Sequence, residues 1–135
     1  MHVSTAIVTG ASEGIGAALT KVLIENGWEV IGISRNLKKV NLLKNNLLVN
    51  NHLLKIFSCD VTDLYKLKLI AFKNKTPELL FLNAWIYNPV DASKNNIEIY
   101  KKHLDVSYLG VINCYEAFLP KMLDERNGQI IIMSS

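Results

Sequence analysis

Three glycines near the start of the chain have the type and spacing of a phosphate-binding loop. They lie in the segment Thr9-Gly10-Ala11-Ser12-Glu13-Gly14-Ile15-Gly16, which follows the pattern Gly-x3-Gly-x-Gly. Glycine has no Cβ, so the backbone at these positions can approach a pyrophosphate closely. Where such a loop opens a helix, free N–H groups and the positive end of the helix dipole face the phosphate. An ordinary glycine-rich turn between a strand and a helix is the alternative.

The other residues capable of chemistry show no spacing that indicates a second site. The three histidines are scattered along the chain, and they suggest no metal site. Cys59 and Cys114 are far apart in sequence and form no Cys-x-x-Cys motif. We therefore expect buried, reduced thiols, no bound metal and a cytoplasmic protein.

Strands and helices alternate along the chain in an order that would position the glycine loop. Apolar, β-branched stretches predict five strands, at Thr5–Thr9, Trp28–Ser34, His52–Cys59, Glu78–Leu82 and Gln129–Met133. Helical periodicity predicts helices that begin near Ile15, Leu37, Thr62 and Asn96, the last being a long helix that reaches Leu123. Continuously apolar strands alternating with helices are typical of a parallel sheet covered on both faces. We expect an α/β, doubly wound sheet in strand order 3-2-1-4-5, in one domain over residues 1–135.

Composition and charge exclude several classes of function. Half of the 135 residues are apolar and 20% are charged, which favours a packed core over disorder. The net charge of +3 is too small to indicate a nucleic-acid or membrane-surface partner. The apolar runs are too short to span a bilayer, and the first residues lack the features of a signal peptide.

The glycine segment resembles the cofactor motif of the short-chain dehydrogenase/reductase family, in its short-subunit branch. Four later segments agree with this family in order and approximate spacing: Cys59-Asp60-Val61-Thr62, Asn83-Ala84, Val106-Ser107 with Gly110, and Gly128-Gln129-Ile130 through Ser134-Ser135. The resemblance implies a Rossmann-like fold, truncated after the fifth strand. It also implies an NAD(P)-dependent oxidoreductase that moves hydride between a nicotinamide and a carbonyl or alcohol carbon. In the loop, it assigns cofactor contacts to Gly10, Ser12, Glu13, Gly14, Ile15 and Gly16.

The end of the second predicted strand indicates which nicotinamide cofactor is bound. In NAD-preferring relatives an acidic residue stands at the position of Ser34 and binds the adenosine ribose hydroxyls. Ser34 lacks that charge, and Arg35 can pair with the 2′-phosphate of NADP through a charge-assisted fork. We therefore expect NADP rather than NAD, with a solvated Arg35 as the alternative. Glu13 is evidence against NADP, because some NADP-preferring relatives carry a basic residue at this position.

The resemblance assigns roles to two further segments. Asp60 accepts a hydrogen bond from the adenine amino group with the help of the Val61 backbone, or else it begins a turn or helix. Asn83 bonds backbone between neighbouring strands, and Ala84 lets the nicotinamide ribose approach. Trp85 stands where the family has glycine, so its indole would crowd the cofactor or close the cleft.

The catalytic residues of the family are only partly present in this sequence. The family uses a Ser that binds the substrate carbonyl, a Tyr that transfers the proton, and a Lys four residues later that lowers the Tyr pKa. Ser135 aligns with the serine, and Ser107 stands at a fourth catalytic position that is usually Asn. None of the five tyrosines has a lysine four residues after it. We therefore expect a fragment or truncated form of the enzyme, inactive alone.

Other functions remain as alternatives. Trp85, Ser107 and the absent Tyr-x-x-x-Lys motif favour a non-catalytic nucleotide-binding or interaction protein. Methyltransferases that use S-adenosylmethionine share the strand–loop–helix opening, but they usually end the second strand with an acidic residue. Nucleotide-sugar epimerases tend to have the spacing Gly-x-x-Gly-x-x-Gly.

The partners expected are a small-molecule carbonyl or alcohol substrate in the complete enzyme and further copies of the chain. If Gln129–Met133 is the last strand, its apolar edge is free to pair with another chain. An apolar face on the long helix, formed by Val106, Leu109, Val111, Ile112 and Phe118, would also be uncovered. We therefore expect a homo-oligomer, a dimer or larger.

Overall fold

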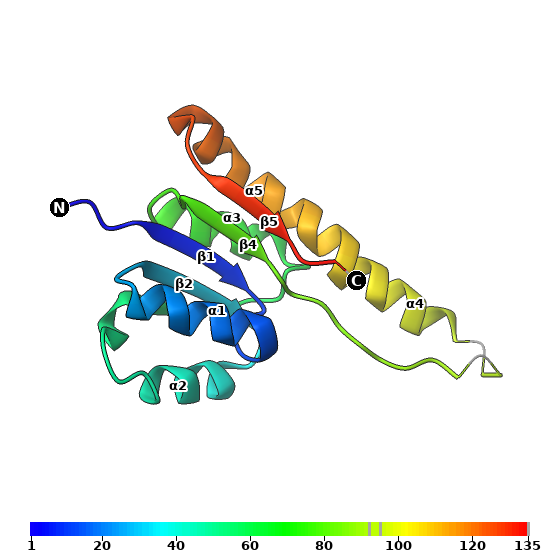
Figure 1. Cartoon of the computed structure of the whole chain (residues 1–135). Coiled ribbons are helices and arrows are strands. Elements are labelled where there is room, and N and C mark those ends of the chain that lie inside the picture. Colours follow the sequence, from blue (N-terminus) through cyan, green and yellow to red (C-terminus); the bar gives the residue numbers. More distant parts are fainter. Residues whose placement is uncertain (92, 95, 135) are drawn as a thin grey trace.

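A parallel sheet with helices on both faces forms the framework of the molecule (Figure 1). The computed structural model describes residues 1–91, 93–94 and 96–134. In this part of the chain the strands are ordered β3-β2-β1-β4-β5, and every neighbouring pair is parallel. The strands are β1 (Thr5–Thr9), β2 (Glu29–Ser34), β3 (Leu54–Ser58), β4 (Leu79–Leu82) and β5 (Gln129–Ile132). The predicted α/β class and strand order 3-2-1-4-5 are confirmed.

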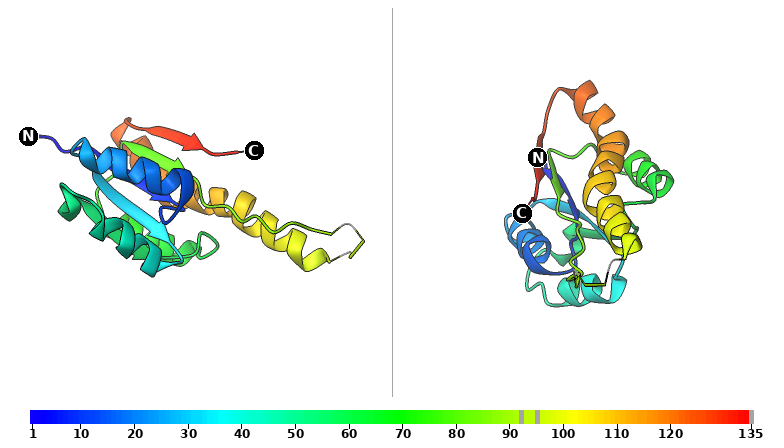
Figure 2. Two further views of the ribbon diagram at one scale, coloured as in Figure 1. Left: turned by 60° about the horizontal axis from the view of Figure 1, so that its bottom comes forward. Right: turned by 90° about the vertical axis from the view of Figure 1, so that its right-hand side faces the viewer.

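The helices divide between the two faces of the sheet (Figure 2). The elements are α1 (Gly14–Glu25), α2 (Leu37–Asn45), the 3-10 turn η1 (Asn51–Leu53), α3 (Leu64–Lys73), α4 (Ile97–Leu104), the π-helical segment η2 (Asp105–Leu109) and α5 (Gly110–Glu125). Side chains alternate between the faces of a strand, so Ala6 and Val8 pack with Ile24 of α1, whereas Ile7 packs with Leu67 and Phe118. The two cores therefore cover the two faces of the sheet.

Three predicted strands, β2, β3 and β4, begin one or two residues later than expected. For β2 and β3 the reason is that local turns take the first predicted residues. Gly27 has φ +81° and its N–H donates to Ile24 O, while the Trp28 N–H donates to Leu23 O. These bonds close the C-terminus of α1, so Trp28 belongs to the helix-ending turn. Residues 51–53 form η1 after Asn50, whose φ is +56°, so β3 begins at Leu54.

The predicted long helix is three segments, α4, η2 and α5. Within η2 the Val106 side chain is buried, and at the start of α5 a Cβ on Gly110 would lie 2.5 Å from Val61 Cγ2. The absence of a side chain at Gly110 therefore lets the helix lie against the loop that follows β3. No helix among the described residues has both the length and the apolarity needed to cross a membrane.

The residues expected to form one apolar face on the long helix do not share a face. Val106 and Phe118 are buried against the sheet, whereas Leu109 and Ile112 are 47% and 46% exposed. The inward side repeats at intervals of about four residues through Val106, Gly110, Cys114 and Phe118, which places Leu109 and Ile112 on the outer side. The outer side also carries exposed Leu104, Tyr108 and Leu123.

Candidate cofactor site

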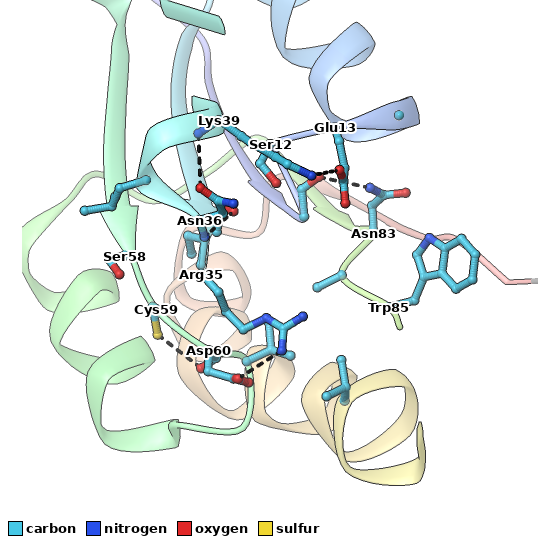
Figure 3. Close-up of a pocket in the computed structure, with 18 of the residues that line it drawn as sticks. Ser12, Glu13, Arg35, Asn36, Lys39, Ser58, Cys59, Asp60, Asn83 and Trp85 are labelled. Atoms are coloured by element: carbon cyan, nitrogen blue, oxygen red, sulfur yellow. Dashed lines mark hydrogen bonds and ion pairs between the residues drawn. The ribbon is translucent and has the colours of Figure 1, made fainter. Parts of the chain in front are cut away.

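A hollow of about 1150 Å³ opens at the carboxyl ends of the first four strands (Figure 3). Loops that follow β1, β2, β3 and β4 line it, as expected where the strand order reverses in a doubly wound sheet. Eleven of the twelve residues predicted to contact a cofactor line this hollow: Gly10, Ser12, Glu13, Gly14, Ile15, Ser34, Arg35, Asp60, Val61, Asn83 and Ala84. The twelfth, Gly16, lies behind the loop.

The three glycines of the loop do different things. Gly10 and Gly14 have positive φ values of +64° and +57°, which form the turn into α1. A Cβ on Gly10 would lie 2.9 Å from Asn83 O, whereas a Cβ on Gly14 would meet nothing within 4 Å. Gly14 is therefore the glycine of the three that borders open space. A Cβ on Gly16 would collide with the Gly10 carbonyl oxygen, so Gly16 permits the close packing of helix and loop.

The N-terminus of α1 is an electropositive helix end at the hollow. The N-cap residue Glu13 makes no side-chain hydrogen bond to the first turn, and that turn contains no acidic residue. The first N–H groups of a helix have no intrahelical partner, and they carry the positive end of its dipole. This end of α1 therefore has the chemistry of an anion site.

Hydrogen bonds between β1 and β4 fix the opposite wall of the hollow. The Asn83 side-chain amide donates to Gly10 O at 3.3 Å, which is the inter-strand bond expected from the sequence. The Thr9 hydroxyl oxygen accepts from the N–H groups of Asn83 and Ala84 at 3.0 and 3.1 Å. Thr9 is a positioning residue that sequence reasoning missed, although it directly precedes the first glycine of the motif.

The turn after β2 directs Arg35 into the hollow. The Ser34 hydroxyl is buried and accepts from the Asn36 N–H at 3.1 Å. Asn36 in turn caps α2, because its Oδ1 accepts from the Lys39 N–H at 3.2 Å. With Ser34 and Asn36 engaged in this turn, the half-exposed Arg35 side chain points across the hollow toward Asp60 (Figure 3).

The carboxylate of Asp60 has two sets of contacts. Its Oδ1 accepts from the Thr62 N–H at 3.0 Å and from the Thr62 hydroxyl at 2.9 Å, which forms a turn ahead of α3. Its Oδ2 lies 3.8 Å from Arg35 Nη1. The turn role considered for Asp60 is therefore present, and one carboxylate oxygen still faces the hollow.

A second ion pair lies at the α1 side of the hollow. Lys39 Nζ in the first turn of α2 contacts Glu13 Oε2 at the N-cap of α1. Lys39 was not among the predicted site residues, since only the fold brings its side chain to Glu13, 26 positions earlier. The sequence signal that could have identified it is its position four residues after Arg35, at the predicted start of the second helix.

Both cysteines are buried free thiols, as predicted. Burial raises the pKa of Cys59 to about 11, with a smaller contribution from the nearby Asp63 carboxylate. Burial also raises the pKa of Cys114 to about 12. Cys59 lines the hollow, but its thiol is neutral at ordinary pH and is therefore a poor nucleophile there. The described residues contain no cluster of His, Cys, Asp and Glu that could hold a metal ion.

Comparison with known proteins identifies the family. The model of the short chain dehydrogenase family matches residues 4–135. This chain belongs to the short-chain dehydrogenase family. Oxidoreductase UcpA of Salmonella typhimurium is 31% identical over 140 residues, which cover 97% of this chain and 51% of that protein. The NADPH-dependent pterin aldehyde reductase of Arabidopsis thaliana is also 31% identical, over 97% of this chain and 56% of the reductase.

Among solved structures, the closed form of serine dehydrogenase complexed with NADP+ matches this chain with a TM-score of 0.87 and 26% identity. The match covers 97% of this chain and 54% of the serine dehydrogenase chain. This short-chain dehydrogenase chain thus spans about half the length of the relatives and the structure that it matches.

Of the two serines predicted as catalytic residues, only Ser107 lies among the described residues, and it does not line the hollow. Ser107 is exposed in η2 and is absent from the hollow's lining, although its neighbour Val106 contributes to it. Ser135 lies outside the described residues. Trp85, at the family's glycine position, lines the hollow together with Tyr87. The two rings form an edge-to-face pair with their centroids 6.1 Å apart.

Proposed function

We propose that this chain binds NADP as the dinucleotide-binding domain, residues 1–135, of an oxidoreductase of the short-chain dehydrogenase type. The observation that carries this proposal is the helix N-terminus of α1 beside two cations, Arg35 and Lys39, in one hollow. Since the chain spans about half the length of its relatives, hydride transfer is proposed for a protein of full family length. A small-molecule carbonyl or alcohol would be the substrate.

The residues around the hollow fit a dinucleotide with a 2′-phosphate. The open space beside Gly14 and the uncapped end of α1 suit a pyrophosphate. Ser34 brings no negative charge to the end of β2, and Arg35 offers a planar fork for a phosphate. The names of two similar proteins, an NADPH-dependent reductase and a dehydrogenase complexed with NADP+, support the same cofactor.

In this proposal the described residues bind and orient the nucleotide. The first turn of α1 holds the pyrophosphate, Asp60 and Val61 hold the adenine, and Asn83 and Ala84 border the nicotinamide ribose. NADPH held in this way would supply the hydride for reduction of a carbonyl group. Ser135 would bind that carbonyl and Ser107 would assist a proton relay. Because the sequence contains no Tyr-x-x-x-Lys, we propose that the 135-residue chain alone transfers no hydride.

A non-catalytic nucleotide-binding protein is the second candidate. The exposed position of Ser107 outside the hollow and the Trp85 indole within it favour this function. Both candidates require the nucleotide site. The oxidoreductase additionally requires a tyrosine and a lysine in the same gene, so the coding sequence beyond codon 135 distinguishes them.

We further propose a cytoplasmic location and a homo-oligomeric state. Two free thiols suit a reducing compartment. The apolar side chains on the outer side of the α4–η2–α5 segment support self-association, as does the edge of β5 that pairs with no other strand in the described part of the chain.

Calorimetric titration of the chain with NADPH and NADH tests the nucleotide site. We expect saturable binding of both, with the tighter dissociation constant for NADPH. If neither nucleotide binds a chain that circular dichroism shows to be folded, the proposed function is wrong. Equal affinities would leave a nucleotide site but contradict the preference for NADP.

A further inference from the structure

The ion pair between Glu13 and Lys39 lies in the hollow where a nucleotide would bind. Glu13 is the N-cap of α1, beside the proposed pyrophosphate site, and Lys39 is in the first turn of α2. Both residues line the hollow, and Figure 3 shows the Lys39 side chain extending from α2 to the Glu13 carboxylate. The pair therefore links the N-terminus of α1 to the first turn of α2.

This ion pair is exposed, so it can be exchanged at little cost. The Lys39 side chain is 48% exposed and the Glu13 side chain is 70% exposed. Pairs of this kind contribute little to stability, because water and salt screen both charges. A phosphate group accepts stronger, charge-assisted hydrogen bonds from an ammonium than a solvated carboxylate does, since it carries more charge and more acceptor oxygens.

The backbone around Lys39 fixes its relation to Arg35. The Lys39 N–H donates to the Asn36 side chain, and the Asn36 N–H donates to the Ser34 hydroxyl. This chain of bonds begins at the end of β2, where Arg35 enters the hollow. Arg35 and Lys39 are therefore held on one short, hydrogen-bonded turn with both side chains in the same hollow.

We infer that Lys39 is a second cation of the 2′-phosphate subsite and that Glu13 competes with the cofactor for it. In the free protein Lys39 pairs with Glu13, and in the complex it turns to the 2′-phosphate beside Arg35. Lys39 and Glu13 are thus specificity-determining residues. This inference rests on the proposed binding of NADP.

The test compares Lys39→Met, Glu13→Gln and the double variant with the unmodified chain. Calorimetry with NADPH and NADH shows how much the 2′-phosphate contributes to the binding affinity, because the two nucleotides differ only in that group. Titrations with 2′,5′-ADP and AMP repeat the comparison without the nicotinamide. We expect Lys39→Met to lower the affinity for NADPH and for 2′,5′-ADP about 10-fold, which is the scale of one charge-assisted hydrogen bond. The affinities for NADH and AMP should change by less than about 2-fold. Glu13→Gln should raise the affinity for NADPH more than the affinity for NADH. The double variant should lose most of this gain in NADPH affinity.

A matched control is Lys21→Met, which removes a lysine that pairs with Glu25 elsewhere on α1. It makes the same change in net charge, so we expect the same nucleotide affinities as for the unmodified chain. Lys39→Met that weakens NADPH and NADH equally would overturn the inference, since Lys39 would then act only by neutralising Glu13 near the pyrophosphate. No change in either affinity would overturn it as well. In both cases the proposed NADP site would stand, whereas failure of the unmodified chain to bind NADPH and NADH would overturn the proposed function itself.

Discussion

Gly16 lies directly against the Gly10 carbonyl group, so closely that a Cβ on Gly16 would collide with that oxygen. The same Cβ would lie 2.7 Å from Asn83 Nδ2, the atom that donates to Gly10 O. Gly16 thus makes room for the contact that joins the loop after β1 to the end of β4. Its place in the motif reflects packing behind the site, whereas Gly14 borders the space proposed for the cofactor.

Replacement of Gly16 by Ala should therefore destabilise the fold more than replacement of Gly14. Gly16→Ala drives a methyl group into backbone, and overpacking of this kind costs about 3 kcal/mol of unfolding free energy. In Gly14→Ala the added methyl group enters open space, so the only cost is the positive φ of this residue, which lowers the unfolding free energy by about 1 kcal/mol. Urea denaturation of both variants measures the difference. Equal losses of stability would show that the contact between Gly16 and Gly10 is not tight in solution.

Arg35→Glu should weaken NADPH binding selectively. The variant removes a charge-assisted bond to the 2′-phosphate and places a carboxylate beside Asp60, with an expected loss of roughly 1–3 kcal/mol for NADPH. NADH lacks that phosphate, so its affinity should change little. Arg35→Lys is the matched variant, because it keeps the charge without the planar fork and should give a smaller loss. Calorimetry that finds the same NADPH-to-NADH ratio in all three proteins would contradict the assignment of Arg35.

The sequence predicted the layers of this fold well, because they depend on local pattern. Continuous apolar strands and short crossovers leave few arrangements, and the strand order follows from right-handed connections. The glycine loop was also predictable, since its residues are adjacent in the chain. The ion pair of Glu13 and Lys39 was not, because its partners belong to different helices and meet only after both pack on the sheet. The side of the long helix that faces the core was likewise hidden, since Val106 and Leu109 are both apolar and only packing separates them.

Stability should fall in alkaline solution because of Cys114. Burial raises the pKa of this thiol from 9.0 to about 12, so the folded chain keeps its proton over a pH range in which the unfolded chain releases it. The free energy of unfolding therefore decreases as pH rises from about 9 toward 12, because the unfolded state binds fewer protons there. Cys114→Ala should show a shallower decrease over this range, measured by urea denaturation at a series of pH values. Identical slopes for the variant and the unmodified chain would mean that Cys114 does not titrate differently in the two states.

The chain should associate through the edge of β5 or the outer side of the α4–η2–α5 segment. In the described part of the chain β5 pairs with β4 alone, so its other edge keeps free N–H and C=O groups. Ile131 packs against the core and is a poor site for a test, whereas Ile132 is 44% exposed at the end of the strand. Ile132→Lys should break a dimer formed through the edge, and Ile112→Lys should break one formed through the helix, each without loss of the circular dichroism spectrum. The simplest closed assembly has two-fold symmetry. Light scattering at tens of micromolar that finds a folded monomer before any substitution would contradict self-association altogether.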